Sequence, residues 1–550
     1  MKRAWLLGLV LWGFGALFAQ DVVVVAREPG YYTSLARHLQ EGLKRQSIAA
    51  DCTDAKALAT KLASARFAFL VGFVEPSATE LTALRNFCRR GGRLAVFYSR
   101  SAALGELMGV KPCGYTAAPH AGAWSRLDFV ATRPAGMPAT IRQNSQVLER
   151  AVAIPGRSRV IATWSDARGS ATGENAVLQS ANGFWMTHVL LPDTDQDLKG
   201  RLAAAMVGAA FPDVWSAAAQ TAREASIRAA WKRQAESEPP RAGEMHAVWD
   251  HGGWGLYRGD WPRTMRTLAA AGVTDLFLNV AGAGFAHYAS RTLPRSSVYQ
   301  VSGDQLAAAL AAARGTGIRV HAWVLCFTAT RGTQATLADY ARRGWRLRSR
   351  QGALTEYLDP GRADVRRQVI TTVNEIQNNY AVHGIHLDFV RWYEGATQPP
   401  DAAAIVTRFV AEVRRHVKRP RLLTAAVLGK YPDCVKNVAQ DWQAWLASDL
   451  IDYAVPMNYV SDRTKFLSLL RQQAANPACA SRTIVGLGVS ANESTLSFPE
   501  VLDQVKCVRR FGLPGVALFN LNSTMERDIL PYLSLGPWRK PPASLPSRKR

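Results

Sequence analysis

Cysteine is scarce in this sequence, and the few cysteines present form no motif. The 550 residues include 7 Cys, scattered along the chain without a CxxC pair. An odd, scattered set argues against a complete disulfide framework and provides no metal-ligand spacing. Two states stay open for Cys434 and Cys479, a disulfide formed in an oxidising compartment or two buried thiols.

Long apolar segments are missing as well. The run from Ala4 to Phe18 is too short for a comfortable membrane span, and no comparable run follows it. Lys2 and Arg3 precede this run and a small residue, Ala19, follows it, the pattern of a secretory signal peptide. No Cys lies near the cleavage point, so we do not expect a lipoprotein anchor. We therefore expect residues 1–20 to be removed and the mature protein, without a membrane span, to be periplasmic or secreted.

Acidic residues are outnumbered by basic ones. The chain has 67 Lys and Arg against 43 Asp and Glu, a formal net charge of +24. A basic surface favours anionic partners such as cell-wall polymers, outer-membrane sugars or nucleic acid. The arginines are spread along the sequence rather than clustered. This favours a simpler explanation of the positive charge, a genome whose codon composition makes arginine common. No nucleic-acid-binding motif is present and export conflicts with that function, so we expect no nucleic acid partner.

Residues 21–212 alternate strand-like and helix-like segments. Predicted strands are 21–27, 66–74 and 93–99, and predicted helices are 31–48 and 79–90. Alternation of this kind indicates a doubly wound parallel sheet with helices on both faces, a flavodoxin-like or amidotransferase-like α/β domain.

One segment of this domain carries a resemblance to a known group. The stretch LRNFCRRGGRLAVFYS, residues 84–99, resembles glutamine-amidotransferase-like domains that are attached to sugar hydrolases. In the working amidotransferases a Cys nucleophile occupies a tight elbow between such a strand and the next helix. Here Tyr98, Ser99 and Arg100 stand at that place, without flanking glycines. The nucleophile is absent, so we expect a non-catalytic domain.

The pattern of predicted secondary structure changes after residue 212. Residues 213–240 are predicted to be a helical linker ended by Pro239 and Pro240, and residues 535–550 a disordered basic tail. Between them, residues 241–534 repeat a cycle of apolar strand, polar loop and amphipathic helix, which matches a (β/α)₈ barrel. The eight predicted strands are 245–249, 274–280, 319–327, 384–390, 422–429, 451–458, 483–489 and 515–521.

Polar and aromatic residues gather at the ends of these predicted strands. In a (β/α)₈ barrel the carboxyl ends of the strands form the active site. Carboxylates, amides, histidines and flat aromatic rings at one rim suit a sugar, because rings stack on pyranose faces and a carboxylate pair catalyses hydrolysis. The predicted substrate-binding residues are Trp249, His251, Asn279, His321, Trp323, His386, Arg391, Trp392, Asn458 and Tyr459.

The fourth and sixth strands carry a more specific resemblance. The segments YAVHGIHLDFVRWYEG (380–395) and IDYAVPMNY (451–459), together with GIRVHAWV and YLDPGRADVRRQVI, resemble the bacterial glycosyl-hydrolase-like family 10 over residues 241–533. This resemblance implies a (β/α)₈ barrel that cleaves polysaccharides, peptidoglycan glycan included. Asp388 and Arg391 match the family motif directly. His383 replaces the usual acidic residue, and the Pro that normally ends the motif is replaced around Tyr393.

A comparison with family-18 chitinases bears on which residue can donate the proton. Their fourth strand ends in a proton-donating Glu, and alignment on the central Gly places Val390 there. The chitinase route is therefore absent, and another acid must donate the proton. We predict Asp388 as nucleophile or electrostatic stabiliser, with Glu394, Asp250 or Asp462 as alternative donors. Arg391 either orients Asp388 or binds an anionic group of the substrate.

Several of the predicted binding residues have a second interpretation. His321 and His386 are either ligands of the substrate or core histidines, and Trp323 and Trp392 are either stacking platforms or core residues. No His spacing requires a metal, and the Gly-rich segments 251–255 and 281–284 fit neither phosphate-binding pattern, so we expect no metal and no cofactor.

The sequence therefore predicts an exported glycoside hydrolase acting on a polysaccharide. The alternative is a non-catalytic carbohydrate-binding protein on a degenerate barrel. Oligomeric state is left unpredicted.

Overall fold

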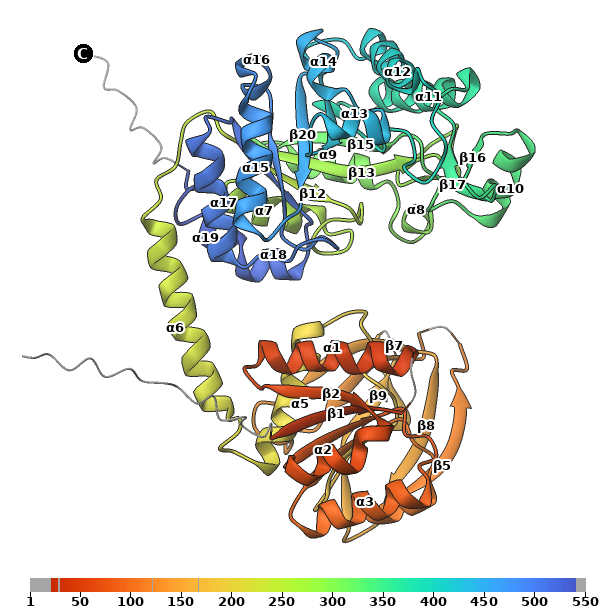
Figure 1. Cartoon of the computed structure of the whole chain (residues 1–550), viewed down its shortest axis with the longest axis vertical. Coiled ribbons are helices and arrows are strands. Elements are labelled where there is room, and N and C mark those ends of the chain that lie inside the picture. The colour runs from red at the N-terminus through yellow and green to blue at the C-terminus, as the bar shows by residue number, and fades with distance from the viewer. Residues whose placement is uncertain (1–20, 28–29, 121, 167, 541–550) are drawn as a thin grey trace, which may run out of the picture. The chain divides into compact units, whose positions relative to one another are not determined.

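The computed structural model describes residues 21–540 except 28–29, 121 and 167. The predicted signal peptide, residues 1–20, and the last ten residues of the predicted tail lie outside the described residues. The chain divides into two compact units, one ending at Ser226 and one beginning at Ile227. Helix α6 (Ala217–Glu236) carries the chain across this boundary (Figure 1).

The first unit is built on a nine-stranded sheet whose first half is parallel. Strands in the order β2 (Ala50–Asp54), β1 (Val22–Ala26), β3 (Phe67–Val71), β4 (Arg93–Phe97) and β11 (Gly183–Met186) form this half. The sequences VVVVA and FAFLV are buried on both faces, as expected for central parallel strands. Separate apolar clusters lie on the two faces of the sheet. The doubly wound α/β fold predicted from this alternation is confirmed.

The helices of the first unit pack around the parallel half. They are α1 (Tyr31–Arg45), α2 (Leu58–Ser64), α3 (Ala78–Arg89), α4 (Ala102–Met108) and α5 (Gln196–Ala210), with the short 3₁₀ turn η1 (Ala55–Ala57). Helix α3 begins with a capping box in which Ser77 and Glu80 satisfy each other's backbone N–H groups.

The second half of the same sheet is antiparallel and was not predicted from the sequence. Strands β10 (Ala171–Ser180), β9 (Ser158–Ser165), β6 (Trp124–Phe129) and β7 (Thr140–Ser145) extend the sheet beyond β11. Strands β5 (Val110–Ala117) and β8 (Val147–Ala153) pair separately. Half-buried and exposed residues alternate along most of β5, which is typical of an antiparallel strand with one solvated face and gives no long apolar run.

The second unit is a closed barrel of eight parallel strands. The barrel closes because β12 pairs with both β13 and β22. All eight strands lie where the sequence predicts them, so the (β/α)₈ fold is confirmed. The strands are β12 (Met245–Asp250), β13 (Asp275–Gly282), β15 (Arg319–Leu325), β18 (Gly384–Asp388), β19 (Leu422–Leu428), β20 (Tyr453–Asn458), β21 (Val485–Gly488) and β22 (Gly515–Phe519).

Helices surround this barrel, and short elements decorate its loops. The larger helices are α7 (Trp261–Ala270), α9 (Gln305–Ala313), α10 (Gln334–Arg342), α11 (Ala363–Asn379), α12 (Ala402–His416), α15 (Arg463–Ala474) and α17 (Phe498–Arg510). The shorter elements are α8 (Ser297–Ser302), α13 (Asp433–Val438), α14 (Trp442–Ala447), α16 (Pro477–Ala480), α18 (Ser523–Asp528), α19 (Leu530–Leu533), β14 (Phe285–Ala286), β16 (Arg346–Arg348) and β17 (Leu354–Leu358).

Two apolar clusters stabilise the barrel. A large cluster fills the layer between strands and helices. A smaller cluster fills the interior and includes Trp249, Phe277, Trp323 and Val455. The interior is therefore packed, and space for a ligand is left only at an end of the barrel.

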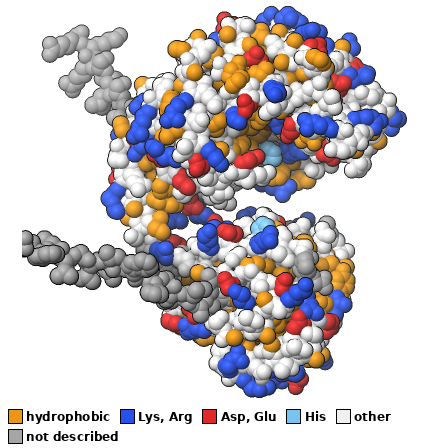
Figure 2. Space-filling view, in the orientation of Figure 1, with side chains coloured by type: hydrophobic (Ala, Val, Ile, Leu, Met, Phe, Trp, Pro, Cys, Tyr) orange, Lys and Arg blue, Asp and Glu red, His pale blue; other side chains and the backbone are white. Residues whose placement is uncertain are grey.

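Three further features relate to the sequence-based expectations: the state of the cysteines, the distribution of basic side chains and the character of the helices. All seven cysteines are free thiols, and Cys434 and Cys479 each contact a backbone carbonyl instead of each other. Lys and Arg side chains are spread over the visible face of both units without gathering in one patch (Figure 2). Among the described residues, no helix combines the length and the apolar character needed to cross a bilayer.

Candidate active site

A pocket of about 450 Å³ opens at the carboxyl ends of the barrel strands. Seven of the eight strands or their following loops contribute to it, β13 being the exception. Its volume falls within the usual range of small-molecule sites. The lining residues are Trp249, His251, Trp323, Leu325, Thr330, Arg331, Asp388, Phe389, Arg391, Ala426, Met457, Tyr459, Ser490, Asn492, Glu493, Phe519 and Asn520.

Asp388 is the last residue of β18 and lies in the wall of this pocket. Its side chain is 6% exposed. Burial raises the pKa of Asp388 above its ordinary value, although the Arg391 guanidinium, the Phe389 amide and the Trp323 indole oppose that rise. Trp323 Nε1 donates to Oδ2 at 3.2 Å, and the Phe389 amide donates to Oδ1 at 2.6 Å. The carboxyl group is thus held in one orientation and retains a proton to higher pH than an ordinary Asp.

The strand ends at Asp388 because Phe389 turns the chain. Phe389 has φ of +49°, in the left-handed region that bulky residues rarely adopt. This turn brings Asp388, Phe389 and Arg391 into the same pocket lining. Backbone strain of this kind is concentrated at functional sites, where surrounding structure holds it in place.

A second carboxylate lines the same pocket. Glu493 lies on the loop after β21 and is exposed to solvent. Burial raises the pKa of Tyr459 well above its usual value, and the charges of Asp388 and, to a smaller extent, Glu493 raise it further. Asp388, Tyr459 and Glu493 therefore line one pocket at the mouth of the barrel.

The three proton donors suggested by the sequence do not line the pocket. Asp250 is buried, and its two oxygens accept hydrogen bonds from the Gly253 and Gly255 amides at 3.0 and 2.7 Å. Asp462 is exposed and caps helix α15 by accepting the Lys465 amide at 2.7 Å. Glu394 is exposed on the loop after β18, where its backbone carbonyl accepts a bond from Arg350. Each of these acids lies outside the pocket, and Asp250 and Asp462 have a structural role.

Five of the ten predicted binding residues do line the pocket. They are Trp249, His251, Trp323, Arg391 and Tyr459. Tyr459 stacks on Phe519 with ring centroids 5.2 Å apart. The His251 ring lies 5.8 Å from both the Trp323 and Phe519 rings, and partial burial and the Arg331 guanidinium lower the pKa of His251. Trp249 and Trp323 are almost fully buried, so each presents an edge or a small part of its ring to the pocket.

The two core histidines are polar groups of the barrel interior. His386 accepts a hydrogen bond from Trp249 Nε1 at 2.9 Å and contacts Thr424 Oγ1 through Nδ1 at 2.8 Å. Burial lowers the pKa of His386 far below its usual value. His321 contacts Asp275, the first residue of β13, at 2.7 Å. Neither ring is among the residues that line the pocket.

The other three predicted ligands, Asn279, Trp392 and Asn458, also lie outside the pocket lining. Asn458 and the helix residue Gln473 exchange two side-chain hydrogen bonds of 3.0 and 2.8 Å. Asn279 accepts a bond from Arg331 Nη1 at 3.0 Å beneath the pocket wall. Trp392 is buried in the outer core, 4% exposed. None of these three residues lines the pocket.

Glu493 follows the seventh predicted strand but was not among the predicted catalytic acids, and Arg331 was not predicted as a member of the site. Arg331 lies on the loop after β15, where its Nη1 donates to Asn279 Oδ1 and to the His251 carbonyl. Both residues belong to loops, and their sequence surroundings show no periodicity that would indicate the direction of a side chain. The only available signal was their place just after a barrel strand.

No group of three or more His, Cys, Asp or Glu in the described part of the chain is arranged to hold a metal ion. The polar groups of the pocket are two carboxyl groups, two guanidinium groups, an imidazole, a phenol and several amides and hydroxyls. Such a set supports proton transfer and hydrogen bonding to hydroxyl-rich ligands.

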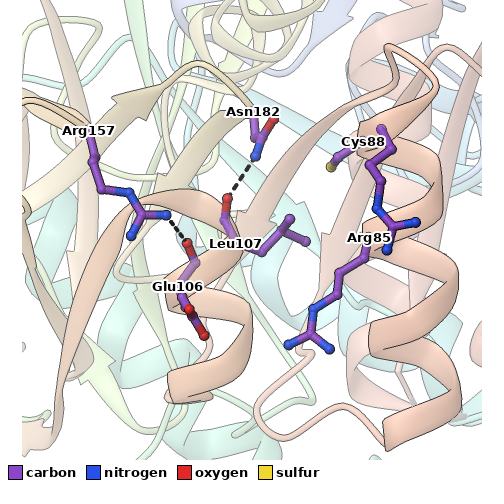
Figure 3. A pocket seen from close by; sticks show the side chains of 7 residues that line it. Arg85, Cys88, Glu106, Leu107, Arg157 and Asn182 are labelled. Atoms are coloured by element: carbon purple, nitrogen blue, oxygen red, sulfur yellow. Dashed lines mark hydrogen bonds between the residues drawn. The ribbon is translucent and has the colours of Figure 1, made fainter.

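The first unit has a hollow of its own, of about 550 Å³. Arg85, Arg89 and Arg157 line it, and Glu106 is its one acidic residue (Figure 3). Arg157 donates a hydrogen bond to the backbone carbonyl of Glu106 at 2.6 Å. Arg85 and Arg89, on helix α3, are exposed to solvent. A hollow without a carboxylate pair does not offer acid–base hydrolysis of a glycoside.

The predicted elbow after β4 is present in the first unit. Tyr98 has φ of +66°, and its ring lies 5.5 Å from that of His188, which follows the neighbouring strand β11. Burial and Glu149 raise the pKa of Tyr98 to about 12. A phenol that holds its proton so firmly is a poor nucleophile.

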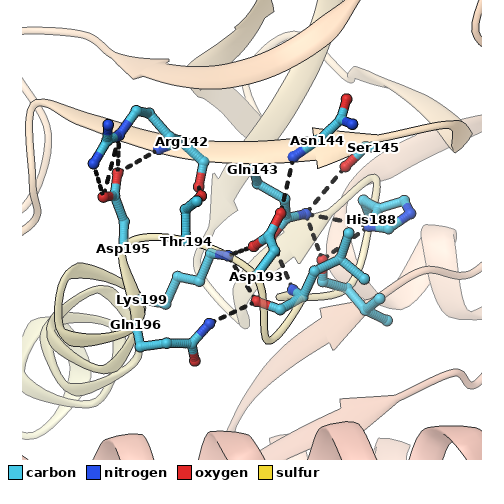
Figure 4. A network of polar contacts seen from close by, with 12 residues as sticks. Arg142, Gln143, Asn144, Ser145, His188, Asp193, Thr194, Asp195, Gln196 and Lys199 are labelled. Atoms are coloured by element: carbon cyan, nitrogen blue, oxygen red, sulfur yellow. Dashed lines mark hydrogen bonds and ion pairs between the residues drawn. The ribbon is translucent and has the colours of Figure 1, made fainter. Parts of the chain in front are cut away.

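Polar residues next to this elbow pair with one another. Lys199 is ion-paired with Asp193 and donates to the Leu191 carbonyl at 2.6 Å, and Arg142 pairs with Asp195 at 2.7 Å (Figure 4). Gln143 donates to the Val189 carbonyl at 2.8 Å. These contacts connect the segment between β11 and α5 to strand β7. The cluster therefore has a structural role.

Comparison with solved structures gives likenesses at low identity. The glycoside hydrolase domain of PgaB (BpsB) from Bordetella bronchiseptica is 14% identical and covers 50% of this chain and 93% of its own, with a TM-score of 0.39. Catalytic domain 2 of the Ostrinia furnacalis Group II chitinase is 13% identical over 53% and 94%, with a TM-score of 0.37. The endo-1,4-beta-mannanase of Rhizomucor miehei is 11% identical over 54% and 95%, with a TM-score of 0.38.

No protein-family profile matches the chain, and no curated protein matches it in sequence. The assignment of an activity therefore rests on the residues of the pocket.

Proposed function

We propose that the protein is an exported glycoside hydrolase that cleaves an O-glycosidic bond of a polysaccharide, with Asp388 and Glu493 as its carboxylate pair. The observation that carries the proposal is the presence of two acids in contrasting surroundings within one aromatic-lined pocket at the barrel mouth. Glycosidases need one carboxyl group that is protonated and one that is ionised.

The surroundings of the two acids assign their roles. Asp388 is buried and its pKa is raised, which suits a general acid that protonates the leaving oxygen. Glu493 is exposed to water at the rim and suits the ionised partner, either a nucleophile or the base that activates water. This reverses the role given to Asp388 from the sequence. The separation of the two groups in a substrate complex would decide between retention and inversion.

The aromatic lining of the pocket supports a sugar as the substrate. Tyr459, Phe519 and Phe389 expose ring surface beside the acids. Flat rings pack on the C–H faces of pyranoses, and Asn492, Asn520 and Ser490 provide groups for hydroxyls at the same rim. The combination of apolar platforms with a few convergent polar groups is that of a carbohydrate site.

The test is turnover of purified polysaccharides, bacterial cell-wall glycan strands among them, by wild type, Asp388→Asn and Glu493→Gln. Loss of either carboxyl group should lower kcat by a factor of at least 10². Glu394→Gln serves as the matched control, because this acid is nearby in sequence and outside the pocket. Equal turnover by wild type and Asp388→Asn would remove Asp388 from the mechanism, and equal turnover by Glu493→Gln would remove Glu493.

One observation favours a second candidate, a non-catalytic carbohydrate-binding protein. Val390, at the place of the chitinase proton donor, is fully buried in the outer core. A barrel that has lost one acid in this way can keep its binding pocket. Glycan binding by the wild type without any reducing-end product on long incubation would support this second function.

A further inference from the structure

Arg391 is a cation of the pocket whose hydrogen-bonding capacity is unused. Its Nη1 atom is buried and has no hydrogen-bond partner among the described residues. The guanidinium carbon lies 4.3 Å from the centre of the Phe389 ring, which fixes the plane of the group. A buried N–H of a charged group without an acceptor is costly, and such atoms are normally satisfied by protein, water or ligand.

A second guanidinium stands at the same mouth. Arg331 is anchored through Nη1 to Asn279 Oδ1 at 3.0 Å and to the His251 carbonyl at 3.3 Å. Its guanidinium packs 4.6 Å from the Phe285 ring. Two arginines with restrained orientations thus face one pocket, in contrast to the solvated arginines elsewhere on the surface.

The charges of the pocket do not cancel in the state required for hydrolysis. The lining has two guanidinium groups and two carboxyl groups, and no other charged side chain apart from His251. With one carboxyl group protonated, as a glycosidase requires, the lining has one positive charge in excess. Asp250, behind the lining, acts on Arg331, but both of its oxygens accept hydrogen bonds from the amides of its own loop. His251 adds no charge near neutral pH, because its pKa is lowered. An anionic substituent on the bound sugar would balance the pocket.

We infer that the sugar bound in this pocket carries a carboxylate, which Arg391 binds and Arg331 attracts. The inference rests on the proposed function in that it takes the pocket as the glycan site. Planar guanidinium groups match carboxylates closely, and a fixed, partly desolvated arginine gains more from such a contact than a solvated one. The carboxylate belongs either to a uronic acid or to an acidic ether substituent of an amino sugar.

The alternative role of Arg391 is electrostatic support of Asp388 alone. Arg391 does act on this acid, since its charge opposes the rise in the pKa of Asp388. That effect is the same for every substrate, whereas a contact with a carboxylate changes the preference between charged and neutral sugars. The ratio of kcat/KM values for two matched substrates therefore separates the two roles.

The experiment uses the full chain and two pairs of substrates. One pair is purified cell-wall glycan strands with their carboxylates intact or reduced to alcohols, and the other is a polyuronate with its carboxyl-reduced form. Wild type should prefer the intact form of one pair by about tenfold to a hundredfold, and the pair that shows this identifies the source of the carboxylate. Arg391→Gln should reduce this ratio about tenfold or more, and Arg391→Lys should reduce it less.

Arg350→Gln is the control, because this arginine belongs to the same unit and lies outside the pocket. Thermal unfolding verifies that each variant is folded. A wild-type ratio near one for both pairs, or an unchanged ratio in Arg391→Gln, overturns the inference while leaving hydrolysis in place.

Failure of the proposed function has a different signature. If no substrate is cleaved, binding of the intact and reduced glycans is measured instead. Salt-sensitive binding of the intact form that is lost in Arg391→Gln supports the inference and contradicts hydrolysis. Absence of any preference for the intact form in binding overturns the inference as well.

Discussion

The indole nitrogen of Trp323 lies 3.2 Å from Oδ2 of Asp388, a hydrogen bond that joins β15 to the adjacent strand β18 at the barrel mouth. It fixes the Trp323 ring and the Asp388 carboxyl group in one geometry. Rigid strands and a supporting hydrogen bond are the conditions under which a catalytic group is pre-organised. Trp323 is therefore a positioning residue for the acid first, and a surface for the sugar only with its exposed edge.

The pH profile should report the protonation of Asp388. If Asp388 is the general acid, activity falls on the alkaline side as it loses its proton. The Arg391 charge lowers the pKa of Asp388, so Arg391→Gln should move the alkaline limb of kcat to higher pH by about one unit. The measurement is kcat against pH for both proteins. Movement of the acidic limb instead would assign Asp388 the ionised role.

Asp250 should prove structural although it lies at a strand end. Removing its carboxylate in Asp250→Ala leaves the buried Gly253 and Gly255 amides without acceptors, and we expect a loss of about 2 kcal/mol in the free energy of unfolding. Urea denaturation measures this loss. Asp250→Asn keeps one acceptor and should lose less. A drop in kcat of more than a hundredfold in a folded Asp250→Asn protein would restore Asp250 as a proton donor.

Glu394 and Asp462 should be dispensable for turnover. Glu394→Gln should change neither kcat nor stability measurably, because the side chain is exposed and outside the pocket. Asp462→Ala removes the N-cap of helix α15 and should cost about 1 kcal/mol of stability with little effect on kcat. Kinetics and thermal unfolding of both variants provide the comparison. A large loss of kcat in either would contradict the placement of the site.

His386 should make the stability of the protein fall with acid. Its pKa in the folded state is far below that in the unfolded state, so the unfolded chain binds the extra proton as the pH drops below about 6.5. The free energy of unfolding then falls by about 1.4 kcal/mol per pH unit from this group. Denaturation at pH 7.5 and 5 should show a smaller difference for His386→Gln than for wild type, although the variant is less stable at pH 7.5. An equal difference in both proteins would mean that His386 is protonated in the folded state.

Alternation along the strands explains why several predicted ligands do not line the pocket. Met457 and Tyr459 line the pocket, so Asn458 between them must face the helices, where it pairs with Gln473. His321 and Trp323 share a face, yet His321 lies one layer deeper and nearer the start of the strand. The period of two was visible in the sequence, and it would have excluded Asn458 as a ligand.

The acids show where sequence analysis reaches its limit. Asp250 and Asp388 have equivalent positions, each the last residue of an apolar strand. One turns its oxygens to the amides of its own loop, and the other lies in the pocket wall beside Trp323. Glu493 looks in sequence like any solvated loop residue.

The sequence by itself determined the two α/β units, all eight barrel strands and the place of Asp388 at the end of a strand, because these follow from apolar patterns of fixed period and from a motif confined to one strand. The tertiary structure alone decided which second acid lines the pocket with Asp388 and which polar residues belong to the core. Loop side chains take their direction from contacts with segments distant in sequence, such as those that orient Arg331, and no local pattern encodes those contacts.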